Sequence, residues 1–292
     1  MKLVLRRWQI AYRIKPSGSI FTDLNTPFIA IPNTLRYMAA DPFLFTENGK
    51  TYLFAELQDS HDNLGKIGYA EFDGEKFGDW KVVISENYHL SYPNIFRYKG
   101  NIYIVPESSA SKQLYAYKAV SFPDKWEKCG VLLDNIPVVD TTFTDYEGKH
   151  LMFTYDITDY ENGKLWLYEV GDNGKAELYC DEPISEDVSV ARHGGNFLNY
   201  EGKLLRVAQD CDGDYGKALV FLDVKSLERN GYSEEIFKRI EPVEVTINKD
   251  KVTGLHTYNA DENIEVIDFH VPDYFHSFSP GRVIHKIKKR LG

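Results

Sequence analysis

Apolar and polar positions along the chain form a hairpin pattern that recurs about every fifty residues. Each copy has an apolar run, a turn carrying Gly or Asn, and a second apolar run, which is typical of a β-hairpin. The turns contain Gly49, Gly100, Gly148 and Gly202, and a weaker fifth turn lies near Asn263. The copies cover residues 41–56, 92–107, 140–155, 194–209 and 254–269. Repeats of this length built from short strands predict an all-β, five-bladed β-propeller with four-stranded blades.

The segments between the hairpins predict the remaining strands of each blade. Residues 7–14 alternate between apolar and polar and predict a strand that joins the fifth blade beside residues 254–275. Such a strand would close the ring and remove an exposed sheet edge. Two short helices are expected, at 226–237 and 280–291. Because no linker-like tract interrupts residues 1–292, a single domain is predicted.

Polar residues gather at the end of each hairpin that lies away from its turn. Asp41, Tyr92, Asp140 and Gly194 stand eight residues before the turn glycines, and Glu56, Glu107, Tyr155 and Gln209 stand seven after them. In an antiparallel hairpin these positions lie close together at the open end. If they belong to the inner strands, they converge on one mouth of the central channel. The sequence therefore predicts a carboxylate-lined pocket on the face opposite the turn glycines.

Three carboxylates are the candidate catalytic groups: Asp41, Glu107 and Asp140. Pro42 is expected to hold the preceding Asp41 in an extended conformation that aims it at the mouth. A pair of carboxylates is the minimum equipment for glycosidic chemistry, with one as general acid and the other as base or nucleophile. Partial burial would raise the pKa of the acid into a useful range. The plainer interpretation is that these residues cap turns or mark the solvent end of a strand.

Nine further residues are candidate substrate contacts at the same mouth. They are Glu56, His89, Tyr92, Arg192, His193, Gln209, Asp210, Tyr215 and His256. The three histidines could bind sugar hydroxyls, a phosphate or a metal, and Arg192 could hold an anionic group by a bidentate contact. The histidines have no short metal-ligand spacing, so no cofactor is predicted, while a divalent cation in the central channel stays open.

Composition narrows the classes of partner and location. With 34 Lys and Arg against 44 Asp and Glu, the formal charge is −10, which disfavours general binding to nucleic acid. The three cysteines lack metal spacing and predict a reducing compartment. No secretory signal or transmembrane run is recognised, so a cytoplasmic location is expected. The basic tail at 280–292 could add a peripheral contact with the inner membrane face, although a solvated tail is the simpler interpretation.

An ordered set of motifs resembles a known family. ADPFLF (40–45), HLSYPNIF (89–96), VDTTF (139–143), ARHGGNF (191–197) and LHTYN (255–259) look like the N-terminal domain of plant glucosamine inositolphosphorylceramide transferases. The resemblance spans residues 37–270 and leaves out the separate glycosyltransferase domain of those proteins. It implies carbohydrate chemistry and a fold similar to the propellers of family 43 glycoside hydrolases. Asp41, Asp140 and Glu107 would then match the base, the second Asp and the acid of those hydrolases, whereas Glu56 and the His and Arg residues depart from that pattern.

Three functions are expected, in this order. The first is a transferase of glycan assembly, which moves a sugar from a nucleotide sugar to a glycan or lipid-linked acceptor, with a glycosyltransferase as a further partner. The second is a glycoside hydrolase that uses Asp41, Asp140 and Glu107. The third is a non-catalytic module that binds glycans or serves as a scaffold. The separation of facing carboxylates would discriminate among them.

Overall fold

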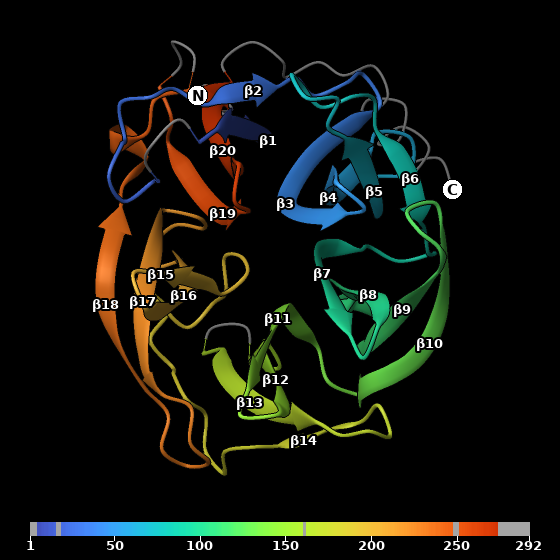
Figure 1. Ribbon diagram of the computed structural model, residues 1–292, viewed down its shortest axis with the longest axis vertical. Helices are drawn as coiled ribbons and strands as arrows, with labels where there is room; N and C mark the ends of the chain where they lie inside the picture. The colour runs from blue at the N-terminus through green and yellow to red at the C-terminus, as the bar shows by residue number, and fades with distance from the viewer. Residues whose placement is uncertain (1–4, 16–18, 160–161, 248–250, 274–292) are drawn as a thin grey trace, which may run out of the picture.

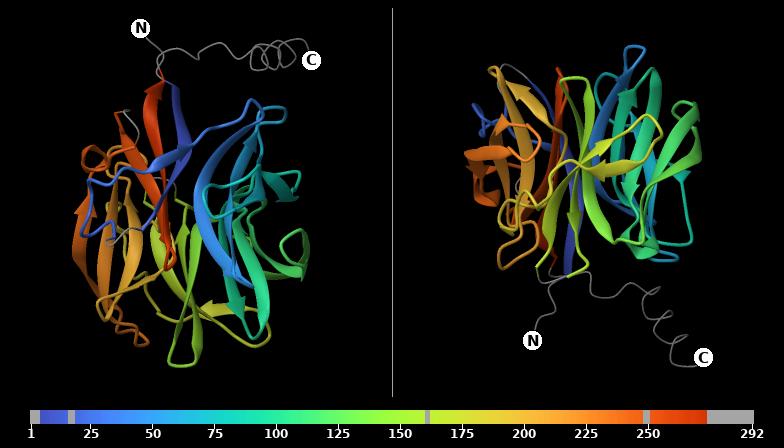
Figure 2. Two further views of the ribbon diagram at one scale, coloured as in Figure 1. Left: turned by 45° about the horizontal axis from the view of Figure 1, so that its top comes forward. Right: turned by 90° about the horizontal axis from the view of Figure 1, so that it is seen from below.

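Five four-stranded sheets surround a central axis in the computed structural model, which describes residues 5–15, 19–159, 162–247 and 251–273 (Figure 1). The strands pair antiparallel within each sheet, and β3, β7, β11 and β19 lie toward the axis. Seen from the side, the blades stand next to one another around that axis (Figure 2). The prediction of a five-bladed propeller is confirmed.

Each sheet is one blade, numbered here along the chain. Blade 1 has β3 (Tyr37–Glu47), β4 (Lys50–Asp59), β5 (Gly65–Glu71) and β6 (Lys81–Ile84). Blade 2 has β7 (Ser91–Tyr98), β8 (Asn101–Glu107), β9 (Gln113–Ser121) and β10 (Lys125–Asp134). Blade 3 has β11 (Val138–Tyr146), β12 (Lys149–Asp156), β13 (Lys164–Val170) and β14 (Ala176–Leu178). Blade 4 has β15 (Leu198–Tyr200), β16 (Lys203–Asp210), β17 (Ala218–Ser226) and β18 (Ser233–Ile240), and blade 5 has β19 (Gly254–Ala260), β20 (Ile264–Asp273), β1 (Leu5–Ile14) and β2 (Ile29–Ile31). The 3₁₀ helices η1 (Ser109–Ser111) and η2 (Pro242–Glu244) lie in connecting segments.

The N-terminal strand closes the ring. β1 lies between β20 and β2, and it pairs with β20 along its whole length, from Leu5 opposite Asp273 to Ile14 opposite Ile264. Ile10 at the centre of β1 is fully buried in the core. The first and the last strands of the described residues therefore belong to one blade, as the alternating pattern at 7–14 predicts. Within the described residues, no helix is long and apolar enough to cross a membrane.

Four of the inner hairpins turn through two residues with left-handed backbone. In the first, Asn48 has φ +51° and Gly49 has φ +74°, and the same pair of positive angles occurs at the turns of Gly100, Gly148 and Gly202. Two consecutive positive φ values define the type I′ turn, whose twist matches that of the flanking strands. Glu47 and Lys50 pair next to the first turn, whereas Ala40 and Glu56 pair near the open end. The glycines thus lie at the opposite end of the hairpins from Asp41.

A β-bulge interrupts the first strand of blades 1, 2, 3 and 5 at the same place in the repeat. The strand register skips two residues after Ala40, Ser91, Val139 and Leu255. In blade 1 the bulge starts at Asp41, whose φ is +50°, so the expected extended conformation of Asp41 is wrong. A bulge bends the strand, and at Asp41 this bend requires a left-handed backbone. Hydrogen bonds from other blades hold Asp41 in that conformation, although the following Pro42 favours an extended one. Asp140 has the same conformation, with φ +49°.

The helix expected at 226–237 is absent from the structure. β17 ends at Ser226 and β18 begins at Ser233, with a turn at Arg229 and Asn230 between them. β18 is the outermost strand of blade 4, where Glu235 and Ile236 are exposed, and Leu222 of β17 pairs with Ile236. Sheet pairing with an apolar strand therefore overrides the helical preference of the local sequence. The second expected helix, at 280–291, lies outside the described residues.

Gly195 allows two blades to approach each other closely, and Gly195→Ala should destabilise the fold by about 2–4 kcal/mol. Its φ is +142°, and an added Cβ would lie 2.0 Å from the carbonyl oxygen of Tyr258 in blade 5. Gly202→Ala is the matched control, because Gly202 has φ +78° and an added Cβ would meet nothing within 4 Å. Urea unfolding of both variants measures the difference. Equal losses of stability would contradict the role of the close contact.

Candidate active site

A cavity of about 280 Å³ opens at the end of the ring that lies away from the hairpin turns. It is lined by Trp8, Met38, Ala40, Asp41, Glu56, His89, Ser91, Glu107, Asp140, Arg192, Tyr215 and His256. Four carboxylates from the first three blades face this small volume. The structure therefore brings the three candidate catalytic residues together, with five of the nine candidate substrate contacts.

Asp41 is held from several sides. One carboxylate oxygen, Oδ2, accepts a hydrogen bond from the backbone N–H of Tyr92 at 3.0 Å, and Oδ1 accepts one from the Thr257 hydroxyl at 3.1 Å. His256 Nε2 lies 3.0 Å from Oδ1 as an ion pair. Burial acts to raise the pKa of Asp41, but His256 and these hydrogen bonds outweigh burial and lower it. Asp41 is thus an ionised carboxylate at neutral pH.

The surroundings of Glu107 shift its pKa in the opposite direction to that of Asp41. Burial, together with the nearby charge of Asp140, raises the pKa of Glu107 to about 7. Arg192 and a 2.9 Å hydrogen bond from the Ser109 hydroxyl act in the other direction but do not cancel that rise. A carboxyl group with this pKa holds a proton over much of the neutral range and can give it up, which a general acid must do.

Asp140 pairs with Arg192 beside Glu107. The Arg192 guanidinium contacts Asp140 Oδ2 in a short ion pair, and the Gln209 amide donates a 3.0 Å hydrogen bond to the same oxygen. Burial nevertheless raises the pKa of Asp140. Arg192 also lies over the ring of Tyr215, with 4.9 Å between the guanidinium carbon and the ring centroid. The Arg192 guanidinium therefore already contacts two residues of the protein, Asp140 and Tyr215.

We expect Asp140→Asn to lower the pKa of Glu107 below about 7. The substitution removes a negative charge that disfavours ionisation of Glu107, and it releases Arg192 to favour that ionisation. A carboxyl ¹³C NMR titration of Glu107 measures the change. Asp79→Asn, at an exposed position outside the cavity, is the control. A Glu107 pKa that stays the same in Asp140→Asn would contradict the coupling.

The rest of the wall pairs a histidine with a carboxylate and adds two aromatic rings. His89 Nε2 lies 3.1 Å from Glu56 Oε1, and this contact raises the pKa of His89. Burial raises the pKa of Glu56 despite His89. Trp8 from β1 and Tyr215 from the loop after β16 meet edge to face, with ring centroids 5.9 Å apart. Flat aromatic faces beside carboxylates are suited to contact a sugar ring.

Four of the candidate substrate contacts do not line the cavity. Tyr92 and His193 have no exposed surface. The Tyr92 hydroxyl lies 2.9 Å from Thr142 Oγ1 and accepts a hydrogen bond from Gly195 N–H, so this side chain joins three blades inside the ring. His193 packs against Phe153 and Phe197, and burial lowers its pKa well below the usual value.

The other two sit behind or beside the cavity wall. Gln209 is fully buried and bonds both Asp140 and the His193 carbonyl, so any influence on a ligand acts through Asp140. Asp210 pairs with Arg239 at 2.5 Å and with Lys217 at 3.6 Å. Gln209 matches Glu56 and Glu107 in the repeat, and Asp210 follows it by one residue. Blade 4 differs from the other blades at this end, because residues 188–194 hydrogen-bond along the end of β16.

Sequence reasoning missed Trp8 and Asp268. Trp8 lies in the N-terminal strand, and only closure of the ring brings it to the cavity. Asp268 lies in the middle of β20, between Ile267 and Phe269, and it has no exposed surface. An acidic residue between apolar neighbours in a predicted buried strand was the available signal, because a buried charge requires a partner.

One group of described residues combines metal-ligating side chains at close range, namely Asp41, His256 and Asp268. The two carboxylates face different nitrogens of the ring, with Asp41 at 3.0 Å from Nε2 and Asp268 at 2.7 Å from Nδ1. That arrangement suits an imidazolium between two carboxylates better than a set of ligands around one ion. These contacts therefore add no support for a divalent cation in the channel.

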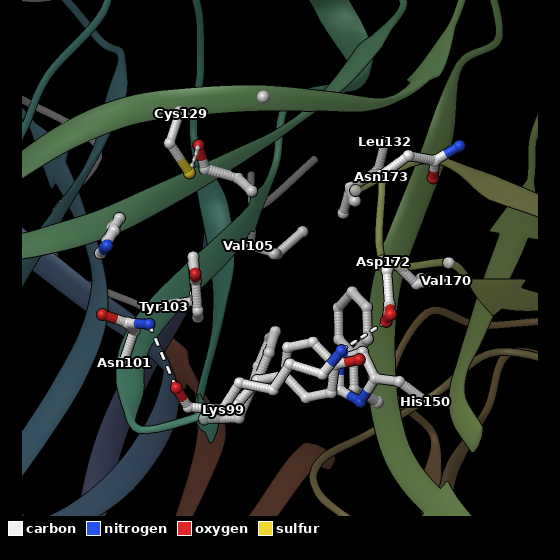
Figure 3. A pocket seen from close by; sticks show the side chains of 18 of the residues that line it. Lys99, Asn101, Tyr103, Val105, Cys129, Leu132, His150, Val170, Asp172 and Asn173 are labelled. Carbon is white, nitrogen blue, oxygen red and sulfur yellow. Dashed lines mark hydrogen bonds and ion pairs between the residues drawn. The ribbon is translucent and has the colours of Figure 1, made fainter. Parts of the chain in front are cut away.

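A larger cavity, of about 530 Å³, lies between blades 2 and 3 near the hairpin turns (Figure 3). Val105, Leu132 and Val170 are among its apolar lining, and an ion pair joins Lys99 to Asp172 beside it. Its lining contains a single Asp and a single Glu, which come from different blades. Because the clustered carboxylates are in the smaller cavity, that cavity is the candidate active site.

Comparisons with known proteins agree on both the family and the fold. Residues 29–264 match the family model described as glucosamine inositolphosphorylceramide transferase 1, N-terminal. Glucosamine inositolphosphorylceramide transferase 1 of Arabidopsis thaliana is 35% identical over 204 residues, which are 67% of this chain and 26% of that protein. The protein of the same name from Oryza sativa subsp. indica is 32% identical over 204 residues, which are 67% of this chain and 27% of that protein. The chain thus spans about a quarter of the length of these relatives.

Among solved structures, the α-L-arabinofuranosidase from Lactobacillus brevis is similar in fold. The TM-score is 0.57 at 14% sequence identity, over 85% of this chain and 88% of that chain. At that identity the likeness concerns the propeller itself. The match to the family model covers most of the chain and includes the residues of the first four blades that line the cavity. The chain therefore belongs to the family defined by the N-terminal region of glucosamine inositolphosphorylceramide transferase 1.

Proposed function

We propose that this chain is a carbohydrate-active enzyme whose central cavity transfers a glycosyl group by acid–base chemistry. The observation that carries the proposal is the opposite behaviour of two carboxyl groups in one small cavity. The pKa of Glu107 is raised to about 7, while that of Asp41 is lowered. Pairs of titratable groups whose surroundings separate their pKa values are typical of acid and base partners.

In the proposed reaction, Glu107 protonates the glycosidic oxygen of the leaving group, and the bond from that oxygen to the anomeric carbon breaks. Water or another sugar hydroxyl forms the new bond to the anomeric carbon and gives its proton to Asp41. Asp140 acts on Glu107, because its charge keeps the acid protonated at higher pH. Glu107 regains a proton from solvent and Asp41 releases one, which completes the cycle.

The charges around the cavity favour a neutral glycoside as the sugar donor. Each cationic side chain of the lining already has a carboxylate partner: Arg192 pairs with Asp140, His89 with Glu56, and His256 with Asp41. The phosphates of a nucleotide sugar would approach four carboxylates and would have to displace one of these pairs. A sugar ring without charge meets hydrogen-bond partners and aromatic faces at no such cost.

Transfer from a nucleotide sugar to a glycan or lipid-linked acceptor is the second candidate. The names of the relatives favour it, since both are called transferases. It would require Arg192 to leave Asp140 and bind a phosphate instead. The identity of the relatives concerns about a quarter of their length, so their full activity does not extend to this chain by similarity alone.

Binding and product analysis on the same samples test the proposal. Wild type and Asp41→Asn are titrated with neutral oligosaccharides and with nucleotide sugars, and the reaction mixtures are analysed by mass spectrometry. We expect binding of an oligosaccharide by both proteins and a released or transferred sugar from wild type alone. Tight binding and turnover of a nucleotide sugar would favour the second candidate. Binding of oligosaccharides by wild type without any product would contradict an enzymatic role.

A further inference from the structure

Two residues of blade 5 form a buried pair behind Asp41. His256 on β19 is 3% exposed, and Asp268 on β20 has no exposed surface. The His256 ring lies between the two carboxylates, with Nε2 toward Asp41 and Nδ1 toward Asp268. In the proposed reaction neither residue is needed as acid or base, yet both are buried charges next to the base.

We propose that Asp268 and His256 are positioning residues that hold Asp41 charged and aimed into the cavity. This inference rests on the proposed function for its catalytic meaning. Independently of the reaction, the two residues fix the conformation and the ionisation of the Asp41 carboxylate.

The hydrogen bonds of Asp268 fix the backbone of two neighbouring blades, blade 5 and blade 1. Its Oδ2 accepts the N–H of Asp41 at 2.9 Å, across the boundary from blade 5 to blade 1. Its Oδ1 accepts the N–H of Thr257 at 2.8 Å. Asp41 and Thr257 both lie in bulges, and Asp41 has the left-handed backbone that costs energy for a residue with a side chain. One carboxylate therefore fastens two bulges and compensates the strain at Asp41.

The charges around Asp41 require a nearby cation. Four carboxylates face Asp41 from β4, β8, β11 and β20, namely Glu56, Glu107, Asp140 and Asp268. The cations that face it are His256 and, farther away, His89. Burial acts to lower the pKa of His256, but Asp268 and Asp41 together raise it well above the usual value. Asp268 thus keeps His256 protonated, and His256 supplies the charge that offsets the carboxylates.

Trp8 packs against His256 in the cavity wall. Its ring centroid lies 3.9 Å from that of His256, at an interplanar angle of 38°. Gly216 leaves room for this ring, since an added Cβ would lie 2.6 Å from Trp8 Cη2. By excluding water from the His256 ring, Trp8 strengthens the attraction between His256 and the two carboxylates. The closing strand β1 therefore contributes to the site as well as to the ring.

A carboxyl ¹³C NMR titration of Asp41 tests the inference directly. In His256→Gln and in Asp268→Asn we expect the pKa of Asp41 to rise by about 1–3 pH units, because an opposite charge is lost or weakened. His150→Gln is the matched control. It removes a buried histidine of blade 3 that contacts Asp145 and lies outside the cavity lining. Unchanged Asp41 titration in the folded variants would overturn the inference, as would an equal shift in the control.

Two measurements on wild type keep the test decisive if a variant fails to fold. ¹⁵N NMR should find His256 protonated at both nitrogens at pH 8, and a neutral ring at that pH would overturn the inference. Calorimetric titration with Ca²⁺ and with Mn²⁺ should give no binding at this cluster. Stoichiometric binding that shifts the ¹⁵N signals of His256 in wild type would assign a metal site instead and overturn the positioning role.

Activity separates this inference from the proposed function. If the chain turns over a glycoside, the acid limb of kcat/KM should move to higher pH in Asp268→Asn, together with the pKa of Asp41. If no glycan reacts, the proposed function fails while the Asp41 titration still decides the positioning. If glycans react and the acid limb stays in place, the positioning fails while the proposed function stands.

Discussion

Glu107→Gln is expected to lower turnover of a glycoside by about 10²–10⁴-fold, the usual contribution of general acid–base catalysis. Glutamine has nearly the same size and keeps a hydrogen-bond acceptor for the Ser109 hydroxyl, but it has no proton to donate to a leaving group. Asp41→Asn should have an effect of the same order, because it removes the base. Steady-state kinetics on the glycoside identified by product analysis measures both losses.

Glu177→Gln and Asp79→Asn are the controls, since both positions are exposed and lie outside the cavity lining. They should keep wild-type turnover. If Glu107→Gln reacts as fast as Glu177→Gln, Glu107 is not the acid. Circular dichroism of each variant ensures that a loss of turnover is not a loss of the fold.

Glu107→Gln should make the protein more stable than wild type at alkaline pH. The folded pKa of Glu107, about 7, lies above its ordinary value of 4.5, so the unfolded chain releases this proton first. The free energy of unfolding of wild type therefore falls as pH rises from 4.5 to about 7, and it stays at its lower value above that pH. Glutamine does not titrate, and Glu107→Gln should be more stable than wild type at pH 8 but not at pH 4. Urea unfolding at the two pH values measures this, and equal differences at both would contradict the raised pKa.

Arg192→Ala is expected to destabilise the fold by about 3 kcal/mol, at the lower end of the cost of breaking a buried ion pair. The Asp140 side chain is 4% exposed and would lose its cation, while Arg192 is itself 20% exposed and is less costly to remove. The Gln209 amide still donates to Asp140 and limits the loss. The pKa of Glu107 should also rise further, because Arg192 lowers it in wild type.

A double-mutant cycle separates the pair from other effects of the substitution. Arg192→Ala with Asp140→Asn should recover most of the stability lost in Arg192→Ala alone, since no buried charge remains unpaired. Urea unfolding of the two single variants and the double variant gives the coupling free energy. A double variant as unstable as the sum of both single variants would indicate that Arg192 acts on the fold by packing rather than through Asp140.

The fold was predictable because the repeat recurs in register. The turn glycines at positions such as Gly49 and Gly148 need positive φ, and the apolar runs on either side need a partner sheet. The alternation of residues 7–14 was enough to place β1 in blade 5. The short helix expected at 226–237 was wrong because a polar outer strand looks like a surface helix when its pairing partner is ignored.

The site was predictable only as far as the repeat is regular. Asp41 and Asp140 occupy equal slots in blades 1 and 3, and both reach the cavity through a bulge. Tyr92 fills the same slot in blade 2, but its ring turns into the core, where its hydroxyl finds partners in two other blades. Asp268 was missed because its role depends on a contact between blades 1 and 5, which no local pattern contains.

The pH dependence of kcat/KM on a glycoside tests the account most directly. We expect activity to fall as pH rises through about 7, where Glu107 loses its proton, and the Asp140→Asn variant to lose activity at lower pH than wild type. The acid limb should lie below the ordinary pKa of an aspartate, because His256 keeps Asp41 ionised. A rate that stays constant from pH 6 to pH 8, or a basic limb that Asp140→Asn leaves unmoved, would contradict the assignment of Glu107 as the acid.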